Sequence, residues 1–156
     1  MLRELLIKKH INKAVKQGLS IGKNCYIKHK IDFGSEPYLI TIGDHVRITS
    51  GVRFITHDGG VWILRGEQEL KNVDVFGPIT IGNNVHIGNN VIIMPNVTIG
   101  DNVVVGCGAV VTKDIPPNSV AVGVPARVIE TIEEYKNKII KKCDYTHSYS
   151  SEKKRE

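Results

Sequence analysis

His57 is the residue whose type and position best suit acid–base chemistry. It stands in the segment RFITHDGGVW, directly before Asp58 and two glycines and close to Trp62, the only tryptophan. A neutral imidazole can take a proton from a hydroxyl group at physiological pH. We therefore predict that His57 is a general base, with Asp58 and Trp62 as acceptor-binding residues beside it. The alternative is that His57 only occupies a turn of the repeat described below.

The other histidines carry weaker signals. His10 and His147 fall in the terminal segments, where we expect them to be solvated, and His29 carries no clear signal. His45 occupies a turn position of the repeat and is expected to be structural. His86 lies between two inward-facing aliphatic residues, so its ring points outward. It is a further candidate for acceptor binding, although a surface or interface histidine is the default interpretation.

The cysteines and histidines do not form a metal-binding pattern. Cys25, Cys107 and Cys143 are odd in number, far apart and without CxxC spacing. Such usage is typical of reduced thiols in a cytosolic protein rather than of disulfides or a zinc site. We therefore expect a cytoplasmic protein that requires no metal.

The net charge of +5 on 156 residues does not indicate nucleic-acid binding. Residues 1–30 hold eight Lys or Arg and one acidic residue, whereas residues 31–129 hold six Lys or Arg and nine acidic residues. The surplus belongs to the N-terminal segment and is not spread over a binding face. The apolar runs are only a handful of residues long, and no secretory signal is evident, so we expect no integral membrane segment.

A six-residue repeat occupies the middle of the chain. One aliphatic residue recurs every sixth position: Ile81, Ile87, Ile93, Ile99, Val105 and Val111. A second small or aliphatic residue follows four positions later: Val85, Val91, Val97, Val103, Ala109 and Ile115. Between them stand residues expected to turn the chain with a left-handed backbone: Asn84, Asn90, Asn96, Asn102, Gly108 and Asp114. The same frame appears earlier at Ile21-Gly22 and Ile42-Gly43.

Each unit of this repeat predicts one short strand and one turn. Three units close one triangular coil, and successive coils stack about 4.8 Å apart. A single coil cannot bury its interior, so the coils must stack to form a core. The repeat therefore predicts an all-β solenoid of parallel strands.

The remaining segments flank or interrupt this solenoid. Residues 1–18 predict an amphipathic helix with a basic face, which packs on the end of the coil or, alternatively, meets a membrane surface or a polyanion. The coil domain covers residues 19–129, with an excursion over 59–80 where the frame is lost. Loops this long are usually functional, although this one could only cover a neighbouring subunit. Residues 130–156 form the C-terminal helix, expected over 130–142, and a polar tail.

The chain resembles the hexapeptide-repeat acyltransferases in two features. One is the T-H motif before the excursion, and the other is the run PITIGNNVHIGNNVIIMPNVTIGDNVVVGCGAVVTKDIPPNSVAVGVPARVI. The similarity covers roughly residues 20–130 and is to the maltose/galactoside and polysaccharide O-acetyltransferases. It implies a left-handed parallel β-helix with short terminal helices. It also implies a homotrimer with three acetyl-CoA sites between neighbouring β-helices. His57 matches the catalytic histidine, which would act by direct transfer in a ternary complex, with backbone N–H groups holding the oxyanion.

The resemblance also implies which residues contact acetyl-CoA. The pantetheine arm would follow backbone groups, and two cations would meet the nucleotide end. The residues are Gly88, Asn89, Cys107, Thr112, Lys113 and Arg127. Two features depart from the family: His86 stands where sugar-specific members usually carry Trp, and the N-terminal segment is shorter than the helical domain that helps to build their acceptor pocket.

The sequence thus predicts an acetyl-CoA-dependent O-acetyltransferase acting on a hydroxyl of a sugar or polysaccharide precursor. Alternatives on the same fold are acetylation of an antibiotic hydroxyl, N-acetylation of an amino sugar, and a non-catalytic scaffold. The γ-type carbonic anhydrases need an H-x4-H pair, which this chain lacks. Serine acetyltransferases carry a large N-terminal helical domain that has no counterpart here.

Overall fold

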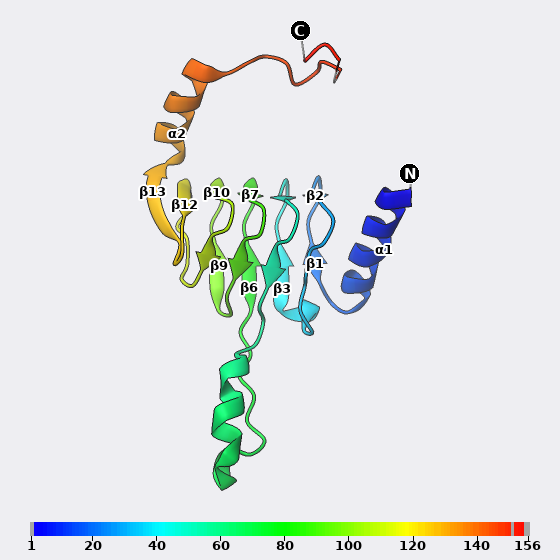
Figure 1. Ribbon diagram of the computed structural model, residues 1–156, viewed down its shortest axis with the longest axis vertical. Coiled ribbons are helices and arrows are strands. Elements are labelled where there is room, and N and C mark those ends of the chain that lie inside the picture. Colours follow the sequence, from blue (N-terminus) through cyan, green and yellow to red (C-terminus); the bar gives the residue numbers. More distant parts are fainter. Residues whose placement is uncertain (1, 151, 155–156) are drawn as a thin grey trace.

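The chain forms a stack of short coils with a helix at each end and an arm that projects from one side (Figure 1). The computed structural model describes residues 2–150 and 152–154. Helix α1 (Leu2–Lys16) precedes the coils, and α2 (Ile132–Ile139) follows them, continued by the 3-10 turn η4 (Ile140–Lys142). Within the described part of the chain, no helix combines the length and apolar composition needed to cross a bilayer.

Three sheets form the walls of the coil, and the chain visits them repeatedly in the same order. The first wall consists of β1 (Ser20–Ile21), β3 (Ile40–Ile42), β6 (Ile79–Ile81) and β9 (Val97–Ile99). The second consists of β2 (Tyr26–Ile27), β4 (Arg47–Ile48), β7 (Val85–Ile87), β10 (Val103–Val105), β12 (Ser119–Val122) and β13 (Arg127–Thr131). The third consists of β5 (Arg53–Phe54), β8 (Ile92–Ile93) and β11 (Val110–Val111). Neighbouring strands pair in parallel except β12 and β13, which are antiparallel.

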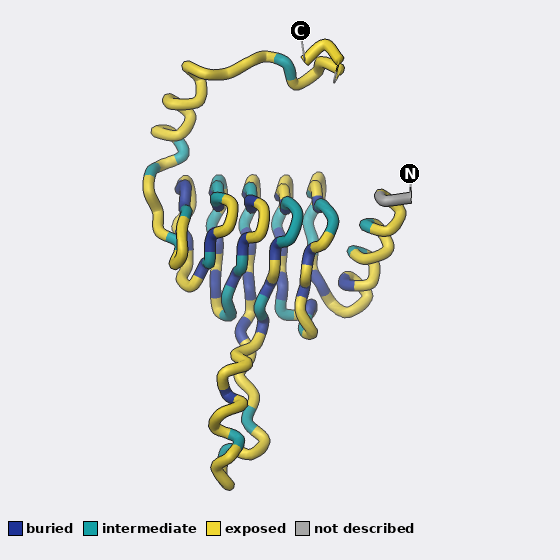
Figure 2. The backbone as a smooth tube through the Cα atoms, viewed as in Figure 1, coloured by how far each residue is buried: buried dark blue, intermediate teal, exposed yellow. Residues whose placement is uncertain are grey.

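The interior of the stack is the hydrophobic core. Every aliphatic or small residue that the repeat placed inward between Ile81 and Ile115 is buried, with Ile115 the most exposed of them at 4%, whereas Ile21 in the first coil is only partly buried. In Figure 2, buried residues recur along the stacked coils, whereas the arm and α2 are mostly exposed. Strands of two or three residues have too few hydrogen bonds to stand alone, so stacking of these side chains holds them. The predicted core and the parallel solenoid are therefore confirmed.

The turns follow the prediction with one exception. Asn84, Asn90, Asn96, Asn102 and Gly108 all have positive φ, between 54° and 72°.

Asp114, the sixth predicted turn residue, does not adopt this conformation, and that expectation was wrong. Its carboxylate instead accepts a hydrogen bond from the Thr98 backbone N–H at 2.7 Å. Asn118, with φ 58°, takes the turn position of the last coil.

Side chains at one corner of the coil form a hydrogen-bonded ladder. His45, with φ 56°, brings its Nδ1 to 2.8 Å from Asn84 Oδ1, which confirms its structural role at a turn. Asn84 Nδ2 donates to Asn102 Oδ1 at 2.9 Å, and Asn102 Nδ2 donates to Asn118 Oδ1 at 3.0 Å. The ladder fixes the register of successive coils as well as the turn itself.

The C-terminal helix begins at Ile132 rather than at residue 130. Residues Arg127–Thr131 instead form β13, which turns back along β12. Thr131 then caps α2: its Oγ1 accepts from the Glu134 N–H at 3.2 Å, and Glu134 Oε2 accepts from the Thr131 N–H at 2.7 Å. The antiparallel strand closes the end of the coil before the helix starts.

The excursion is an arm built from two 3-10 segments, η2 (Gly59–Gly66) and η3 (Gln68–Leu70), and it extends away from the stacked coils (Figure 1). Its base is closed by backbone hydrogen bonds from Asp58 N to Val75 O at 2.8 Å and from Gly77 N to Thr56 O at 2.9 Å. The arm therefore leaves and rejoins the coil at one corner, immediately beside His57.

Candidate active site

His57 lies where the chain leaves the coil for the arm, at the corner between the third and first walls. Its backbone forms an antiparallel bridge with Phe76 at the base of the arm. The described residues with a positive φ include His45 but not His57. His57 therefore lacks the left-handed backbone of the other turn residues, and its role as a general base stays a prediction.

Glu36 holds the His57 ring. It stands on the preceding coil, just before the 3-10 turn η1 (Pro37–Leu39), and its Oε2 lies 3.1 Å from His57 Nδ1. The buried hydroxyl of Thr56 donates to the same oxygen at 2.6 Å. The side chain of His57 is 45% exposed and that of Glu36 only 14%. The carboxylate is thus enclosed, while the imidazole reaches the surface.

The carboxyl group of Glu36 is stabilised in its charged form. Burial by itself raises its pKa, but hydrogen bonds from Thr56, His57 and Ser35 outweigh burial and hold the pKa below its usual range. An ionised carboxylate at Nδ1 favours the tautomer in which Nδ1 carries the proton, which leaves the lone pair on Nε2. The arrangement suits a base that acts through Nε2.

Sequence reasoning missed Glu36, although a signal was present. The first two coils are 21 residues apart, as the pairing of Ile21 with Ile42 shows. The same offset leads from Glu36 to His57. The hexad count obscures this offset because three extra residues lengthen the coil around η1 (Pro37–Leu39).

A cavity of about 290 Å³ opens at His57. Its lining residues are Ser35, Glu36, His57, Asp58, Gly59, Val61, Trp62, Arg65, Asp74, Val75 and Phe76. Asp58 is committed to the arm, because its Oδ1 accepts from the Gly60 N–H at 2.8 Å and caps η2. Trp62 borders the cavity but is 76% exposed. Glu36, and not Asp58, is the carboxylate that orients His57.

His86 lies elsewhere in the chain. It stands on β7 in the second wall and lines a different cavity, together with Tyr26 and Arg47. Burial, and to a lesser degree the charge of Arg47, lowers the pKa of His86. Within one chain the structure therefore does not bring His86 to His57.

The residues expected to contact acetyl-CoA lie at the two ends of the third wall, except Arg127, which stands on β13. Gly88 follows β7 and backs onto Cys107, since a Cβ at Gly88 would lie 2.6 Å from the Cys107 nitrogen. Asn89 is joined to the same turn, because its carbonyl accepts from the Gly108 N–H at 2.8 Å. These three residues form one corner, at the start of the third wall.

Thr112 and Lys113 are exposed at the other end of that wall, and Arg127 is exposed at the start of β13 in the second wall. Thr112 and Lys113 follow β11, and the Ala126 N–H before Arg127 donates to Val110 O at 2.8 Å. Arg127 Nη1 donates to the Ala126 carbonyl at 2.8 Å, which leaves the rest of its guanidinium free to meet an anion. Across residues 2–150 and 152–154, no three His, Cys, Asp or Glu side chains lie close enough together to hold a metal ion.

Comparison with known proteins gives a family match in the repeat. The family described as bacterial transferase hexapeptide (six repeats) matches residues 78–113. Protein CapG of Staphylococcus aureus is 51% identical over 154 residues, which cover 96% of this chain and 88% of CapG. Galactoside O-acetyltransferase of Escherichia coli K12 is 48% identical over 118 residues, covering 74% of this chain and 55% of that protein.

Solved structures show the same relationship. A maltose O-acetyltransferase from Clostridium difficile 630 superposes with a TM-score of 0.64 at 42% identity, over 73% of this chain and 59% of that chain. A hexapeptide-repeat acetyltransferase from Vibrio cholerae O1 biovar eltor, complexed with acetyl coenzyme A, gives a TM-score of 0.62 at 32% identity, over 73% and 60%. The chain thus spans most of CapG but only between half and two thirds of the other three proteins.

Proposed function

Because the chain belongs to the bacterial hexapeptide-repeat acyltransferase family, we propose that it is an acetyl-CoA-dependent O-acetyltransferase that acts on a hydroxyl group of a sugar or polysaccharide precursor. The observation that carries this proposal is the His57–Glu36 pair, in which the carboxylate lies 3.1 Å from Nδ1 and leaves Nε2 open to the cavity. Relatives named galactoside and maltose O-acetyltransferase, and the acetyl-coenzyme A complex of the Vibrio relative, support the reaction class.

In this proposal His57 is the general base. Acetyl-CoA supplies the acetyl group as an activated thioester. His57 Nε2 takes the proton of the acceptor hydroxyl as its oxygen forms the ester bond, and returns the proton to the sulfur when the carbon–sulfur bond breaks. Glu36 balances the charge of the imidazolium between these two steps. Backbone N–H groups near the cavity would hold the oxyanion.

The residues present fit a long nucleotide thioester. Gly88 and Cys107 bring the backbones of two coils close together, and a turn without a side chain at Gly88 suits a narrow pantetheine arm. Lys113 and Arg127 supply exposed cations for phosphate groups. Acetyl-CoA would therefore lie along the third wall, held by Gly88, Asn89, Cys107, Thr112, Lys113 and Arg127.

We further propose that the coil is left-handed and that three copies of the chain assemble side by side into a homotrimer. Trp62, Ile63 and Phe76 support assembly, since these apolar side chains on the arm are 76%, 81% and 49% exposed. A projecting arm with such a surface gains free energy by packing on a neighbouring copy. Light scattering on the eluted protein tests this: we expect a trimer, and a monomeric wild type would refute it.

A thiol-release assay tests the enzymatic proposal. The full chain is mixed with acetyl-CoA and a panel of neutral sugars, acidic sugars, amino sugars and chloramphenicol, and free CoA is followed with a thiol-reactive dye. We expect turnover with a sugar hydroxyl and loss of about 10³-fold or more in kcat for His57→Ala. His29→Gln, which removes a histidine outside the cavity, is the matched control and should keep its activity. A wild type that releases no CoA and binds none would refute the proposal, and exclusive turnover of an amine or of chloramphenicol would reassign the acceptor.

A further inference from the structure

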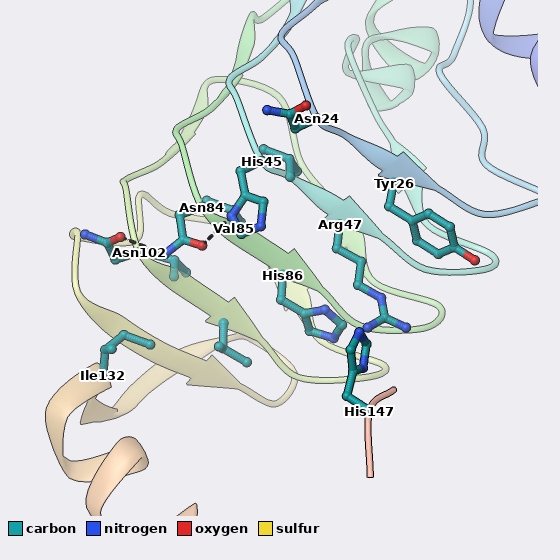
Figure 3. A pocket seen from close by; sticks show the side chains of 13 residues that line it. Asn24, Tyr26, His45, Arg47, Asn84, Val85, His86, Asn102, Ile132 and His147 are labelled. Atoms are coloured by element: carbon teal, nitrogen blue, oxygen red, sulfur yellow. Dashed lines mark hydrogen bonds between the residues drawn. The ribbon is translucent and has the colours of Figure 1, made fainter. Parts of the chain in front are cut away.

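The second wall carries a groove that the proposed reaction does not yet use. Its volume is about 700 Å³, and Figure 3 shows the side chains that line it. Tyr26, Arg47 and His86 stand in one row across β2, β4 and β7, because Tyr26 pairs in register with Arg47 and Arg47 with His86. Strand spacing sets these side chains about 4.8 Å apart along the groove floor.

The groove is positively charged. The guanidinium of Arg47 lies over the Tyr26 ring at 5.6 Å, and no carboxylate pairs with it anywhere in the described residues. His147, from the segment after α2, lies beside Arg47 (Figure 3), and His45 stands at the groove edge. Lys28 Nζ lies 5.1 Å from the Tyr26 ring centre. The guanidinium of Arg47 thus lines the groove, and within the described residues it forms no salt bridge.

The pKa shifts of Tyr26 and His86 agree with the positive charge of the groove. A hydrogen bond to Lys28 and its positive charge lower the pKa of Tyr26, burial opposes them, and the smaller effects of Arg47 and Glu4 lower and raise it respectively. Burial and then Arg47 lower the pKa of His86. Among the described residues, Glu4 supplies the one carboxylate that raises the pKa of Tyr26, and it lies outside the residues that line the groove.

We propose that this groove binds the anionic group, a carboxylate or a phosphate ester, of an acidic saccharide, with Arg47 as its principal contact and Tyr26 and His86 on either side. A planar guanidinium with free donors matches both anions in a two-pronged geometry. The apolar part of the lining, such as Val85 and Val104, gives a sugar ring a surface to lie on. The acceptor of the acetyl group would thus be an acidic sugar rather than a neutral one.

This assignment of the acceptor rests on the proposed function, but the binding site itself does not. Binding is therefore measured first, on full-length protein without acetyl-CoA, by following the His86 ring signals by NMR. The probes are glucuronate, glucose 6-phosphate and the neutral control glucose. An anion beside His86 stabilises its imidazolium, so the titration midpoint of His86 should rise with both anionic sugars and not with glucose.

Arg47→Gln and Arg53→Gln are the matched pair of variants. Both residues are exposed arginines on two-residue strands, but Arg53 stands on β5 in the third wall, outside the groove. We expect Arg47→Gln to weaken glucuronate binding by about tenfold or more and Arg53→Gln to leave it unchanged. Equal binding of glucose and glucuronate, or an unchanged affinity in Arg47→Gln, would overturn the proposal.

Two further measurements are needed. One distinguishes a saccharide from a free phosphate as the ligand, and the other distinguishes failure of the groove from failure of the proposed function. Inorganic phosphate should bind more weakly than glucose 6-phosphate, and equal affinity would overturn the saccharide part of the proposal. In the thiol-release assay, Arg47→Gln should raise KM for an acidic acceptor while KM for acetyl-CoA stays the same. Sugar binding without any CoA release would refute the proposed function and leave the groove standing, whereas turnover of neutral sugars alone would refute the groove as the acceptor site.

Discussion

Replacing Glu36 by glutamine should slow acetyl transfer while preserving the fold. Glutamine keeps the size of the side chain and an oxygen that can accept from Thr56, whose hydroxyl is fully buried and donates to Glu36 Oε2 at 2.6 Å. The variant loses the negative charge that lies 3.1 Å from His57 Nδ1. The change therefore removes charge balance from the imidazolium without opening a cavity.

The expected size of the effect follows from the exposure of the pair. A hydrogen bond to a charged group contributes about 1.5–3 kcal/mol. His57 is 45% exposed, so solvent screens part of this and the lower end, about 1.5 kcal/mol, applies. That corresponds to about a tenfold lower kcat, with KM for acetyl-CoA unchanged because Glu36 does not line the third wall.

Steady-state kinetics of the thiol release, together with thermal unfolding, check this prediction. Glu69→Gln, an exposed carboxylate of the arm, is the matched control and should leave both kcat and the melting temperature unchanged. Glu36→Ala should also lower stability by about 1–3 kcal/mol, because it leaves the buried Thr56 hydroxyl without an acceptor. The reasoning fails if Glu36→Gln keeps wild-type kcat while His57→Ala is inactive.

Four further outcomes follow from titration, burial, backbone conformation and the close approach of two coils. The lowered pKa of His86 means that the unfolded chain binds a proton more readily, so the free energy of unfolding should fall as pH drops through about 6.5, and His86→Gln should lessen that fall in urea titrations. Ile87→Ala should cost about 2–5 kcal/mol, since this side chain is fully buried, whereas Asn84→Ala, at φ 54°, should cost about 1–2 kcal/mol and Asn84→Gly less. Gly88→Ala should raise KM for acetyl-CoA and lower the melting temperature, because the new Cβ would lie 2.6 Å from the Cys107 nitrogen; an unchanged KM would count against the pantetheine path.

The part of the fold that the sequence could predict is the part with a strict period. From Ile81 to Ile115 a six-residue spacing alone identifies the inward residues, because each unit contributes one strand and one turn. The spacing fails at Asp114, where two following prolines and a shorter coil move the turn to Asn118. Periodicity also carries no information on β13, which reverses direction against β12 and has no counterpart in the repeat.

The candidate site could be predicted only in part, because a local period does not reveal contacts between coils. His57 stands out because the frame ends beside it, but its partner Glu36 is identified by stacking between coils, not by a local motif. The row of Tyr26, Arg47 and His86 likewise spans three coils of unequal length and becomes visible only when the strands are in register. Contacts across coils depend on the loop lengths between them, which residue types do not reveal.

The placement of His57 leads to a final prediction about assembly. His57 stands at the corner between the third and first walls, whereas Arg47 stands on the second wall, which faces away from that corner. Within one chain, therefore, the groove cannot face His57. In a ring of copies, the corner that carries His57 can lie against the second wall of a neighbouring copy. Two impaired variants, His57→Ala and Arg47→Gln, should then restore activity to each other when unfolded, mixed in equal amounts, refolded and assayed at a low concentration of an acidic sugar acceptor. Random mixing returns up to about one quarter of the wild-type sites, because an intact site needs His57 from one variant and Arg47 from the other. If both residues served the same site from one chain, every site would keep a defect and the mixture would be no more active than the better variant alone.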